Sequence, residues 1–391
     1  CIMRAPMRIA LFLGIALLIF LPFNAIAYRQ LARLHPRRKR LLLMTIALGN
    51  LMWPFFPLLR SFTTFGRVTR AVLGPLWFGW TSFAILYSLL LFVLLLAWLP
   101  FSRRVDFTRF ARPVSRVFLW LTIASSIAGC YQALVPLRVE HVPVAIADLP
   151  AAAEGMKIAL LTDLHVGLFT RPSRLDEIFA TTAAERPDVV LLAGDLIDDD
   201  PHFVPKLLAG TRALPQATPL LGVLGNHEMY GDPHRVIASL RGSRIRLLVN
   251  EGGAHGPLWI AGISDYAANR EAPELKPNLG AAMNGMPASA TPILLAHQPK
   301  AFDDAIRHSV ALTLAGHTHG GQCGFRPLRL SLAGVFLKRH MGLYREGAAQ
   351  LYINTGTGYW LVPFRLGMTP EIAIIELRRA ASAPSRTAPR P

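Results

Sequence analysis

The chain has 391 residues, of which 52% are hydrophobic and only 17% are charged. This length allows two or three domains, and the composition excludes a disordered chain and is too apolar for an ordinary soluble enzyme. The formal net charge of +17 divides unevenly, because residues 1–140 hold 17 Lys and Arg against two acidic residues whereas residues 141–391 hold 24 against 22. The excess positive charge lies beside apolar stretches, so it indicates membrane-flanking loops and argues against a nucleic-acid partner.

Four stretches in the first 140 residues lack charged residues and are long enough to cross a bilayer, which takes about 20 helical residues. Gly74-Pro75 and Pro100 set the limits of the third stretch. Gly49-Asn50 interrupts the second stretch, which could instead form a kinked or re-entrant segment. The sequence therefore predicts a four-helix transmembrane region over residues 1–140, with helices at about 9–28, 41–59, 76–99 and 117–137.

The Lys and Arg residues indicate whether the first stretch is retained as a helix and how the helices are oriented. Arg4 and Arg8 precede the first stretch and leave open a cleavable signal peptide, but three further apolar stretches favour a retained helix. The first and third loops carry eleven Lys and Arg, and the N-terminus and the second loop carry five. Since positively charged loops stay in the cytoplasm, an even number of spans would place the chain after residue 138 outside the cytoplasm.

After residue 140 the chain consists of short aliphatic runs, each followed by a polar cluster. Such runs, bounded by Gly and Asp, predict buried strands, and the segments 174–185 and 205–214 between them predict helices. In an α/β sheet of this kind functional groups gather at the carboxyl ends of the strands. The predicted strands are 157–162, 188–193, 219–224, 291–296, 311–315, 350–354 and 371–377.

The polar clusters are rich in metal-binding side chains. Eleven of the twelve histidines follow residue 140, and His165, His297, His317 and His319 stand at predicted strand ends. Imidazole and carboxylate donors with no thiolate among them favour a zinc, manganese or iron centre over a structural zinc knuckle. The three cysteines form no metal-binding or disulfide pattern, and the acidic run at 198–200 indicates a solvated loop.

The ordered motifs over residues 145–379 resemble the calcineurin-like metallophosphoesterase superfamily. These motifs are D-L-H at 163–165, G-D at 194–195, G-N-H-E at 225–228, a single histidine at 297 and G-H-T-H-G-G-Q at 316–322. The predicted spans before them resemble the membrane-associated bacterial branch, which implies a bacterial inner or plasma membrane location. The loop charges then predict that the catalytic domain lies outside the cytoplasm. The resemblance further implies a four-layer α-β-β-α sandwich with mixed sheets over 145–379. The composition of residues 380–391 predicts a disordered tail.

The resemblance also implies a centre of two divalent ions, with manganese, iron or zinc as candidates. Asp163, His165, Asp195 and His319 would hold the first ion, and Asp195, Asn226, His297 and His317 would hold the second. His227 and Asp195 would be the catalytic residues, with His227 stabilising charge on the phosphoryl group or protonating the leaving oxygen. Glu228 would contribute to substrate binding and orient His227. Thr355 stands where the branch often has an arginine, so Arg365 would supply a cation facing the substrate phosphate.

Together these inferences predict a membrane-anchored phosphoesterase that hydrolyses phosphoester or phosphoanhydride bonds by attack of metal-activated hydroxide on phosphorus. A lipid-linked substrate is attractive because the catalytic domain begins directly after the last predicted span. The alternative is a non-catalytic metal-binding membrane module that binds a partner. The sequence does not distinguish a monoesterase, a diesterase and a pyrophosphatase.

Overall fold

A computed structural model describes residues 21–22, 24–26, 28–29, 31–50, 90, 92–360 and 363–380. The chain divides into two compact units, residues 1–127 and residues 128–391. The predicted tail at 380–391 lies outside the described residues except for Ala380.

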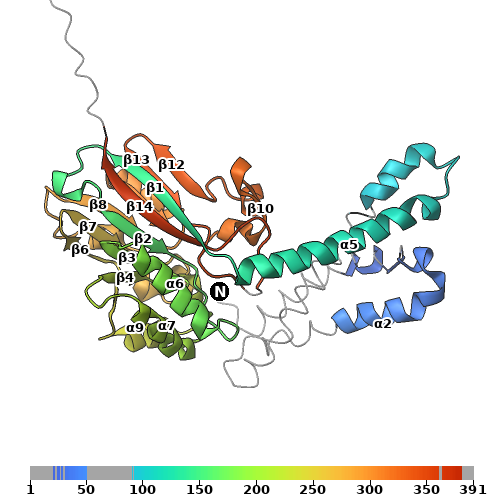
Figure 1. Cartoon of the computed structure of the whole chain (residues 1–391), viewed down its shortest axis with the longest axis horizontal. Helices are drawn as coiled ribbons and strands as arrows, with labels where there is room; N and C mark the ends of the chain where they lie inside the picture. The colour runs from blue at the N-terminus through green and yellow to red at the C-terminus, as the bar shows by residue number, and fades with distance from the viewer. Residues whose placement is uncertain are drawn as a thin grey trace, which may run out of the picture. The chain divides into compact units, whose positions relative to one another are not determined.

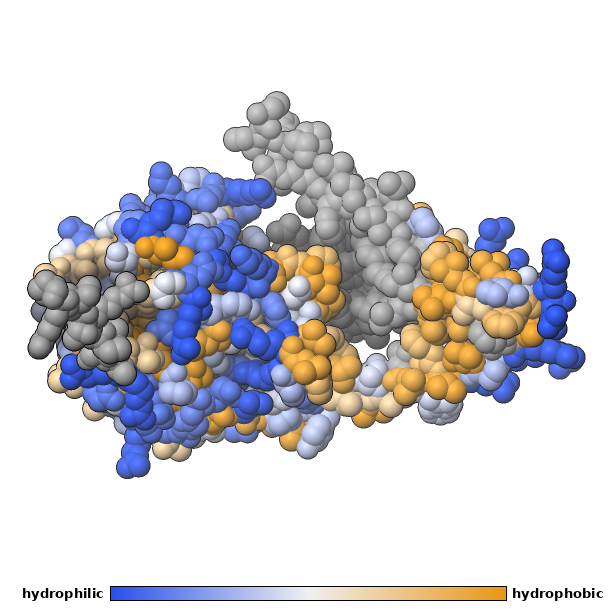
Figure 2. Space-filling model, turned by 90° about the horizontal axis from the view of Figure 1, so that it is seen from above, coloured by the Kyte–Doolittle hydropathy of each residue, from blue (hydrophilic) through white to orange (hydrophobic). Residues whose placement is uncertain are grey.

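The described part of the first unit is helical. It contains α2 (Lys39–Asn50), the 3-10 turns η1 (Pro36–Arg38) and η3 (Leu99–Phe101), and the first part of α5 (Phe107–Leu134). α5 begins ten residues before the predicted start at 117, because the Asp106 side chain accepts hydrogen bonds from the backbone N–H groups of Thr108 and Arg109 and so caps the helix. Apolar side chains cover much of the surface of these helices, for example Met44 and Trp120, which are both 68% exposed (Figure 2).

The four predicted spans are not confirmed. Within the part of the chain that the structure describes, no helix combines the length and the apolar character that a membrane crossing requires. The predicted spans 9–28 and 76–99 and the second half of 41–59 lie largely outside the described residues.

The second unit contains two six-stranded mixed sheets (Figure 1). The first sheet has the strand order β1-β14-β2-β3-β4-β5, in which β14 and β2 are antiparallel and the other neighbours are parallel. Its strands are β1 (Arg138–Ile146), β2 (Lys157–Leu161), β3 (Val189–Ala193), β4 (Leu220–Val223), β5 (Ile245–Leu247) and β14 (Glu371–Arg379).

The second sheet has the order β12-β13-β9-β8-β7-β6, with antiparallel pairs at its two edges and parallel pairs between. Its strands are β6 (Glu251–His255), β7 (Leu258–Gly262), β8 (Thr291–Leu295), β9 (Leu312–Ala315), β12 (Gly342–Glu346) and β13 (Ala349–Ile353). A separate hairpin pairs β10 (Gly324–Phe325) with β11 (Leu330–Ser331).

Helices cover the outer faces of both sheets. Those of the unit are α6 (Pro172–Ala184), α7 (Val204–Gly210), α8 (Asn226–Tyr230), α9 (Pro233–Leu240), α10 (Ala268–Glu271), α11 (Leu279–Ala282) and α12 (Ala301–Arg307). Short 3-10 turns are η4 (Ala151–Ala153), η5 (Pro201–Phe203), η6 (Thr211–Ala213), η7 (Pro273–Leu275), η8 (His319–Gln322), η9 (Arg326–Leu328) and η10 (Ala333–Val335).

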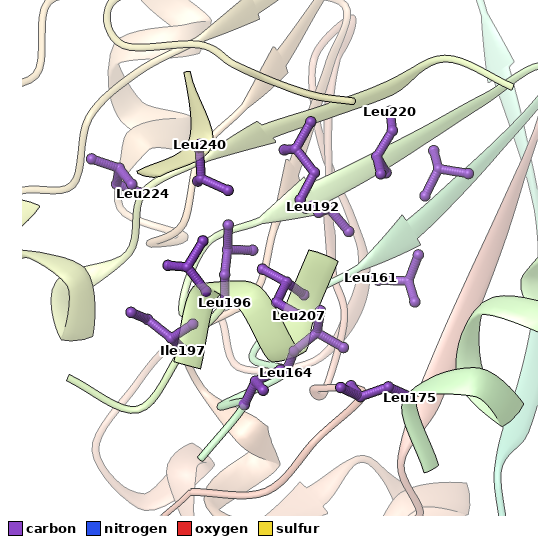
Figure 3. Packing of buried hydrophobic residues seen from close by; sticks show 14 of the residues in the cluster. Leu161, Leu164, Leu175, Leu192, Leu196, Ile197, Leu207, Leu220, Leu224 and Leu240 are labelled. Atoms are coloured by element: carbon purple, nitrogen blue, oxygen red, sulfur yellow. The ribbon is translucent and has the colours of Figure 1, made fainter. Parts of the chain in front are cut away.

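Three apolar layers hold this arrangement together and establish an α-β-β-α sandwich. The first layer lies between the first sheet and helices α6, α7 and α9, and includes Leu192, Leu207 and Leu240 (Figure 3). The second lies between the sheets, and the third lies between the second sheet and α11 and α12. Since both faces of each sheet are covered, the central strands are continuous aliphatic runs, as all five buried residues of β3 illustrate. The predicted fold class of the catalytic region is confirmed.

Candidate metal centre

The sequence-predicted donors meet at the carboxyl ends of strands from both sheets. Asp163 and His165 follow β2, Asp195 follows β3 and Asn226 follows β4, all in the first sheet. His297 follows β8 in the second sheet, and His317 and His319 follow β9. Because the parallel strands of the two packed sheets end at the same edge, residues up to 156 positions apart in sequence become neighbours.

A first group of donors consists of Asp163, His165 and His319, whose ligand atoms all lie within 4.8 Å of one another. His319 Nε2 lies 3.3 Å from Asp163 Oδ1 and 3.1 Å from His165 Nε2. Asp195 Oδ2 approaches the same place, 3.6 Å from His165 Nε2. These four side chains are buried and point their donor atoms at a common point.

A second group consists of Asp195, His297 and His317, and meets the same distance criterion. His297 Nε2 lies 3.2 Å from Asp195 Oδ2, 3.1 Å from His317 Nδ1 and 3.0 Å from the amide oxygen of Asn226. Asp195 therefore faces both groups. Imidazole nitrogens together with carboxylate and amide oxygens form a ligand set that fits a divalent transition-metal ion.

The protonation states of the donors suit metal binding. Burial lowers the pKa values of His165 and His319 well below the ordinary value, and burial together with the charge of nearby His297 lowers the pKa of His317 to about 3. All three imidazoles are thus neutral near pH 7, which leaves lone pairs available to a cation.

The buried carboxylates supply a negative charge that needs a counterion. Burial lowers the pKa of His297, but the charge of Asp195 and a hydrogen bond to it outweigh that effect and raise this pKa well above its ordinary value. Burial raises the pKa of Asp163 to about 6. A divalent cation held by Asp195, Asn226 and His297 would supply the positive charge that the proton on His297 supplies here.

The backbone is strained at this site. Asp163, His165, Asp195, His317 and His319 all have φ between 42° and 72°, in the left-handed region that non-glycine residues rarely adopt. Each such residue costs on the order of 1–3 kcal/mol, and strain of this kind concentrates at functional sites. Five of the seven predicted ligands share this conformation, which aims their side chains toward one point.

Two glycines provide the space for this convergence. A Cβ at Gly225 would overlap the Asp195 carboxylate. Gly194 has φ +82°, and a Cβ there would lie 2.8 Å from His297 Nδ1. A larger residue at position 225 would displace the Asp195 carboxylate, and one at position 194 would displace the His297 imidazole.

Glu228 differs from the prediction that it orients His227. Its buried carboxylate accepts hydrogen bonds from the backbone N–H groups of Asp195, Ile197 and Gly225, at 3.1, 3.0 and 2.7 Å. The side chain points toward the ends of β3 and β4 because these unpaired N–H groups lie there. Glu228 therefore fixes the loop that carries Asp195, and it is a positioning residue.

Asp199 is the residue that orients His227. Its Oδ1 lies 2.5 Å from His227 Nδ1, and the backbone N–H of His227 donates to Asp195 Oδ1 at 2.9 Å. The acidic run at 198–200 is a loop before η5, as predicted, but Asp199 also pairs with His227, which the prediction did not include. Only the fold, which brings the start of α8 beside that loop, reveals the pair.

Arg365 also differs from the prediction that it faces the substrate. The side chain is fully buried, and its guanidinium donates to the carbonyl oxygens of Gly358 and Thr355 at 2.8 Å and of Met368 at 3.2 Å. Its Nη2 lies 3.2 Å from His319 Nδ1. Arg365 thus contacts the predicted metal ligand His319 inside the protein. Three backbone carbonyl oxygens hold its guanidinium there, away from the surface.

Comparisons with known proteins agree with this geometry. Residues 156–321 match the family model of calcineurin-like phosphoesterases. An uncharacterized metallophosphoesterase of Helicobacter pylori is 32% identical over 307 residues, which cover 76% of this chain and 81% of the relative. A transmembrane protein with metallophosphoesterase domain from Danio rerio is 33% identical over 280 residues, which cover 67% of this chain and 62% of the relative. The chain belongs to the calcineurin-like metallophosphoesterase family and is a metal-dependent phosphoesterase.

Proposed function

We propose that this phosphoesterase works with two divalent metal ions held on either side of Asp195. The first ion is assigned to Asp163, His165, Asp195 and His319, and the second to Asp195, Asn226, His297 and His317. The observation that carries this proposal is that the buried Asp195 Oδ2 lies 3.6 Å from His165 Nε2 of the first group and 3.2 Å from His297 Nε2 of the second. Manganese, iron and zinc all suit such a donor set.

The remaining residues prepare the site for phosphoryl transfer. When bound, divalent ions lower the pKa of water to give a nucleophile near neutral pH and polarise a phosphoryl oxygen. Glu228 holds the Asp195 loop in place through three backbone hydrogen bonds. His227 lies at the edge of the donor groups with its side chain 12% exposed, so its imidazolium can stabilise phosphoryl charge or donate a proton to the leaving oxygen.

Removal of metal is expected to abolish hydrolysis. Purified full-length protein dialysed against a chelator should lose activity toward aryl phosphomonoesters, aryl phosphodiesters and pyrophosphates, and should regain it with Mn²⁺, Fe²⁺ or Zn²⁺. Elemental analysis should find two ions in each active chain. A single ion per fully active chain would contradict the dinuclear assignment, and tight metal binding without any activity would favour the non-catalytic module.

Replacement of Arg365 is expected to weaken metal binding. Lysine keeps the positive charge but cannot reach three carbonyl oxygens and His319 at once, so Arg365→Lys loosens the support of a ligand. Loss of such a supporting contact typically lowers metal affinity by about 10–100-fold. Calorimetric titration of metal into the metal-depleted variant and into the unaltered protein measures the change in affinity.

The matched control for this variant is Arg378→Lys, since Arg378 is exposed and pairs with Glu376 and Glu154 at the end of β14. This change should leave metal affinity as it is in the unaltered chain. If Arg365→Lys also keeps full affinity, the positioning role is wrong, and a loss of thermal stability alone would assign Arg365 to folding only.

We further propose that the chain is attached to a membrane and that its substrate is lipid-linked. Exposed apolar side chains on α2 and α5 support attachment, as do the names of the relatives from Danio rerio and Bos taurus, both described as transmembrane proteins. The first strand of the catalytic unit, β1, starts one residue after the last predicted span. Release of the chain from membranes by alkaline carbonate would contradict integral attachment.

A further inference from the structure

The stretch from Phe325 to Leu337, here called the apolar segment, exposes large hydrophobic side chains on the catalytic unit. It begins at the last residue of β10, contains β11 and two 3-10 turns, and lies outside the two large sheets (Figure 1). Leu328 is 66% exposed, Val335 is 71% exposed and Phe336 is 80% exposed. The exposed set comprises Phe325, Leu328, Leu330, Leu332, Val335, Phe336 and Leu337. A contiguous run of this kind marks an interaction surface.

The apolar segment is held in a fixed shape, so its exposure belongs to the folded protein. The backbone N–H of Leu332 donates to the Cys323 carbonyl at 2.8 Å. Ser331 Oγ lies 2.9 Å from His340 Nδ1 and accepts from the N–H of Gly334 at 3.1 Å. Arg326 anchors the segment to the core through an ion pair of 2.6 Å with the buried Glu371. These bonds involve polar groups of the segment, whereas its large apolar side chains are exposed.

The cations near the apolar segment are mostly engaged within the unit, and Arg329 stacks on Tyr344, which leaves Lys338 to face an anionic partner. Residues 324–340 contain four cations, Arg326, Arg329, Lys338 and Arg339, and no Asp or Glu. Arg326 and Arg339 form ion pairs within the unit. Lys338 is exposed and has no ion-pair partner among the residues that the structure describes. Apolar side chains flanked by Lys and Arg are the composition that binds the interface of anionic bilayers.

The apolar segment adjoins the metal centre. It starts shortly after the predicted ligand His319, and Thr318 Oγ1 donates to the carbonyl of His340 at 2.7 Å, which ties the end of the segment to the ligand loop. A pocket of about 230 Å³ is lined by His317, Lys300, Leu337 and Lys338 among others. The pocket thus has Leu337, the last residue of the segment, and His317, a predicted ligand, in the same lining, together with three cations and the single acid Asp303.

We propose that the apolar segment inserts into the interfacial layer of an anionic phospholipid bilayer and presents phosphoesters of membrane lipids to the metal centre. The bilayer contact stands on the exposed surface itself. The choice of substrate class rests on the proposed phosphoesterase function.

Spin labels on the full chain in lipid nanodiscs test the contact. In a background without Cys1, Cys130 and Cys323, the variant Phe336→Cys carries the label at the segment, and Ala238→Cys on the exposed surface of α9 is the matched control. The nanodiscs contain phosphatidylcholine with or without phosphatidylglycerol. Collision of each label with oxygen, which concentrates in lipid, is compared with collision with a water-soluble nickel chelate.

The label at 336 is expected to collide more with oxygen and less with the nickel chelate than the label at 238. This difference should be larger in nanodiscs that contain phosphatidylglycerol. Lys338→Gln should reduce the effect of phosphatidylglycerol. Equal nickel access at the two positions would overturn the proposal. Protection of position 336 from both reagents would overturn it in favour of a protein partner, and spin–spin broadening would identify that partner as a second copy.

A kinetic comparison tests the substrate class separately. Phe336→Asp is expected to lower hydrolysis of a phosphoester embedded in the nanodisc by about tenfold relative to a soluble aryl ester, because the apolar contact is lost. Ala238→Asp should leave the ratio of the two rates unchanged. If the label reports lipid contact but this ratio does not move, the bilayer contact stands and the lipid substrate is wrong; absence of all hydrolysis would instead refute the proposed function.

Discussion

Asp195→Asn is expected to lower kcat by about 10³-fold or more, because one carboxylate serves both donor groups. Stabilisation by a metal ion contributes several kcal/mol to phosphoryl transfer, and each 1.36 kcal/mol corresponds to a tenfold change in rate. Asparagine keeps the size of the side chain and the acceptor for the N–H of His227, but it lacks the negative charge that both ions need. Activity toward an aryl phosphodiester and metal content measured on the same sample check the result.

The control is Asp176→Asn, which changes the same residue type on the exposed face of α6 and should leave kcat and metal content unaltered. Circular dichroism and thermal unfolding should show that both variants fold. A variant at 195 that retains two ions and near-normal kcat would exclude a shared carboxylate and would require the two donor groups to act independently.

The central strands and the polar residues that follow them could be predicted from sequence because their signal is local. Each strand that is buried on both faces must be a continuous aliphatic run, and each predicted run lies within or next to a strand of the two sheets. The polar residue that ends such a run must lie at the carboxyl edge of the sheet. Hence Asp163, Asp195 and His297 could be placed at one edge without knowledge of the fold.

Edge strands could not be predicted in this way. β1 alternates between exposed and buried residues at its end and contains Pro143, which suits an edge position, and it begins before the predicted domain start at 145. β6 has the sequence EGGAH, which has no aliphatic character at all, and it forms only because β7 provides a partner. Pairing with the neighbouring strand, and not the pattern of their own residues, makes β1 and β6 strands.

The supporting residues were missed or misassigned because their roles depend on three-dimensional packing. A carboxylate such as Glu228 is equally suited to hold a histidine or three backbone N–H groups, and only the positions of β3 and β4 decide between them. Arg365 lies 46 residues after His319, in a segment without regular structure, so nothing local indicates that its guanidinium is buried behind that histidine. The predicted ligands come directly after strands, whereas the positions of the residues that contact them depend on the shape of the loops.

His227→Gln is expected to lower kcat by about 10²–10⁴-fold, the usual contribution of a general acid, when the leaving group is an alkoxide. A nitrophenolate leaves without protonation, so the same variant should lose much less activity toward a nitrophenyl ester. Comparison of kcat for ester series with leaving groups of different pKa measures this difference. An equal loss for all leaving groups would assign His227 to the stabilisation of phosphoryl charge and contradict its role as the acid.

Asp199→Asn is expected to shift the alkaline limb of the kcat profile to lower pH. Burial lowers the pKa of His227, but the charge of Asp195 and the hydrogen bond and charge of Asp199 outweigh burial and raise this pKa to about 10. The imidazolium is therefore protonated below that pH and loses its proton above it. Removal of the Asp199 charge lowers the pKa, so the protonated form and its activity disappear at a lower pH, while the acidic limb should stay in place. Asp176→Asn again provides the control, and an alkaline limb that does not move would show that proton loss from His227 does not limit the rate.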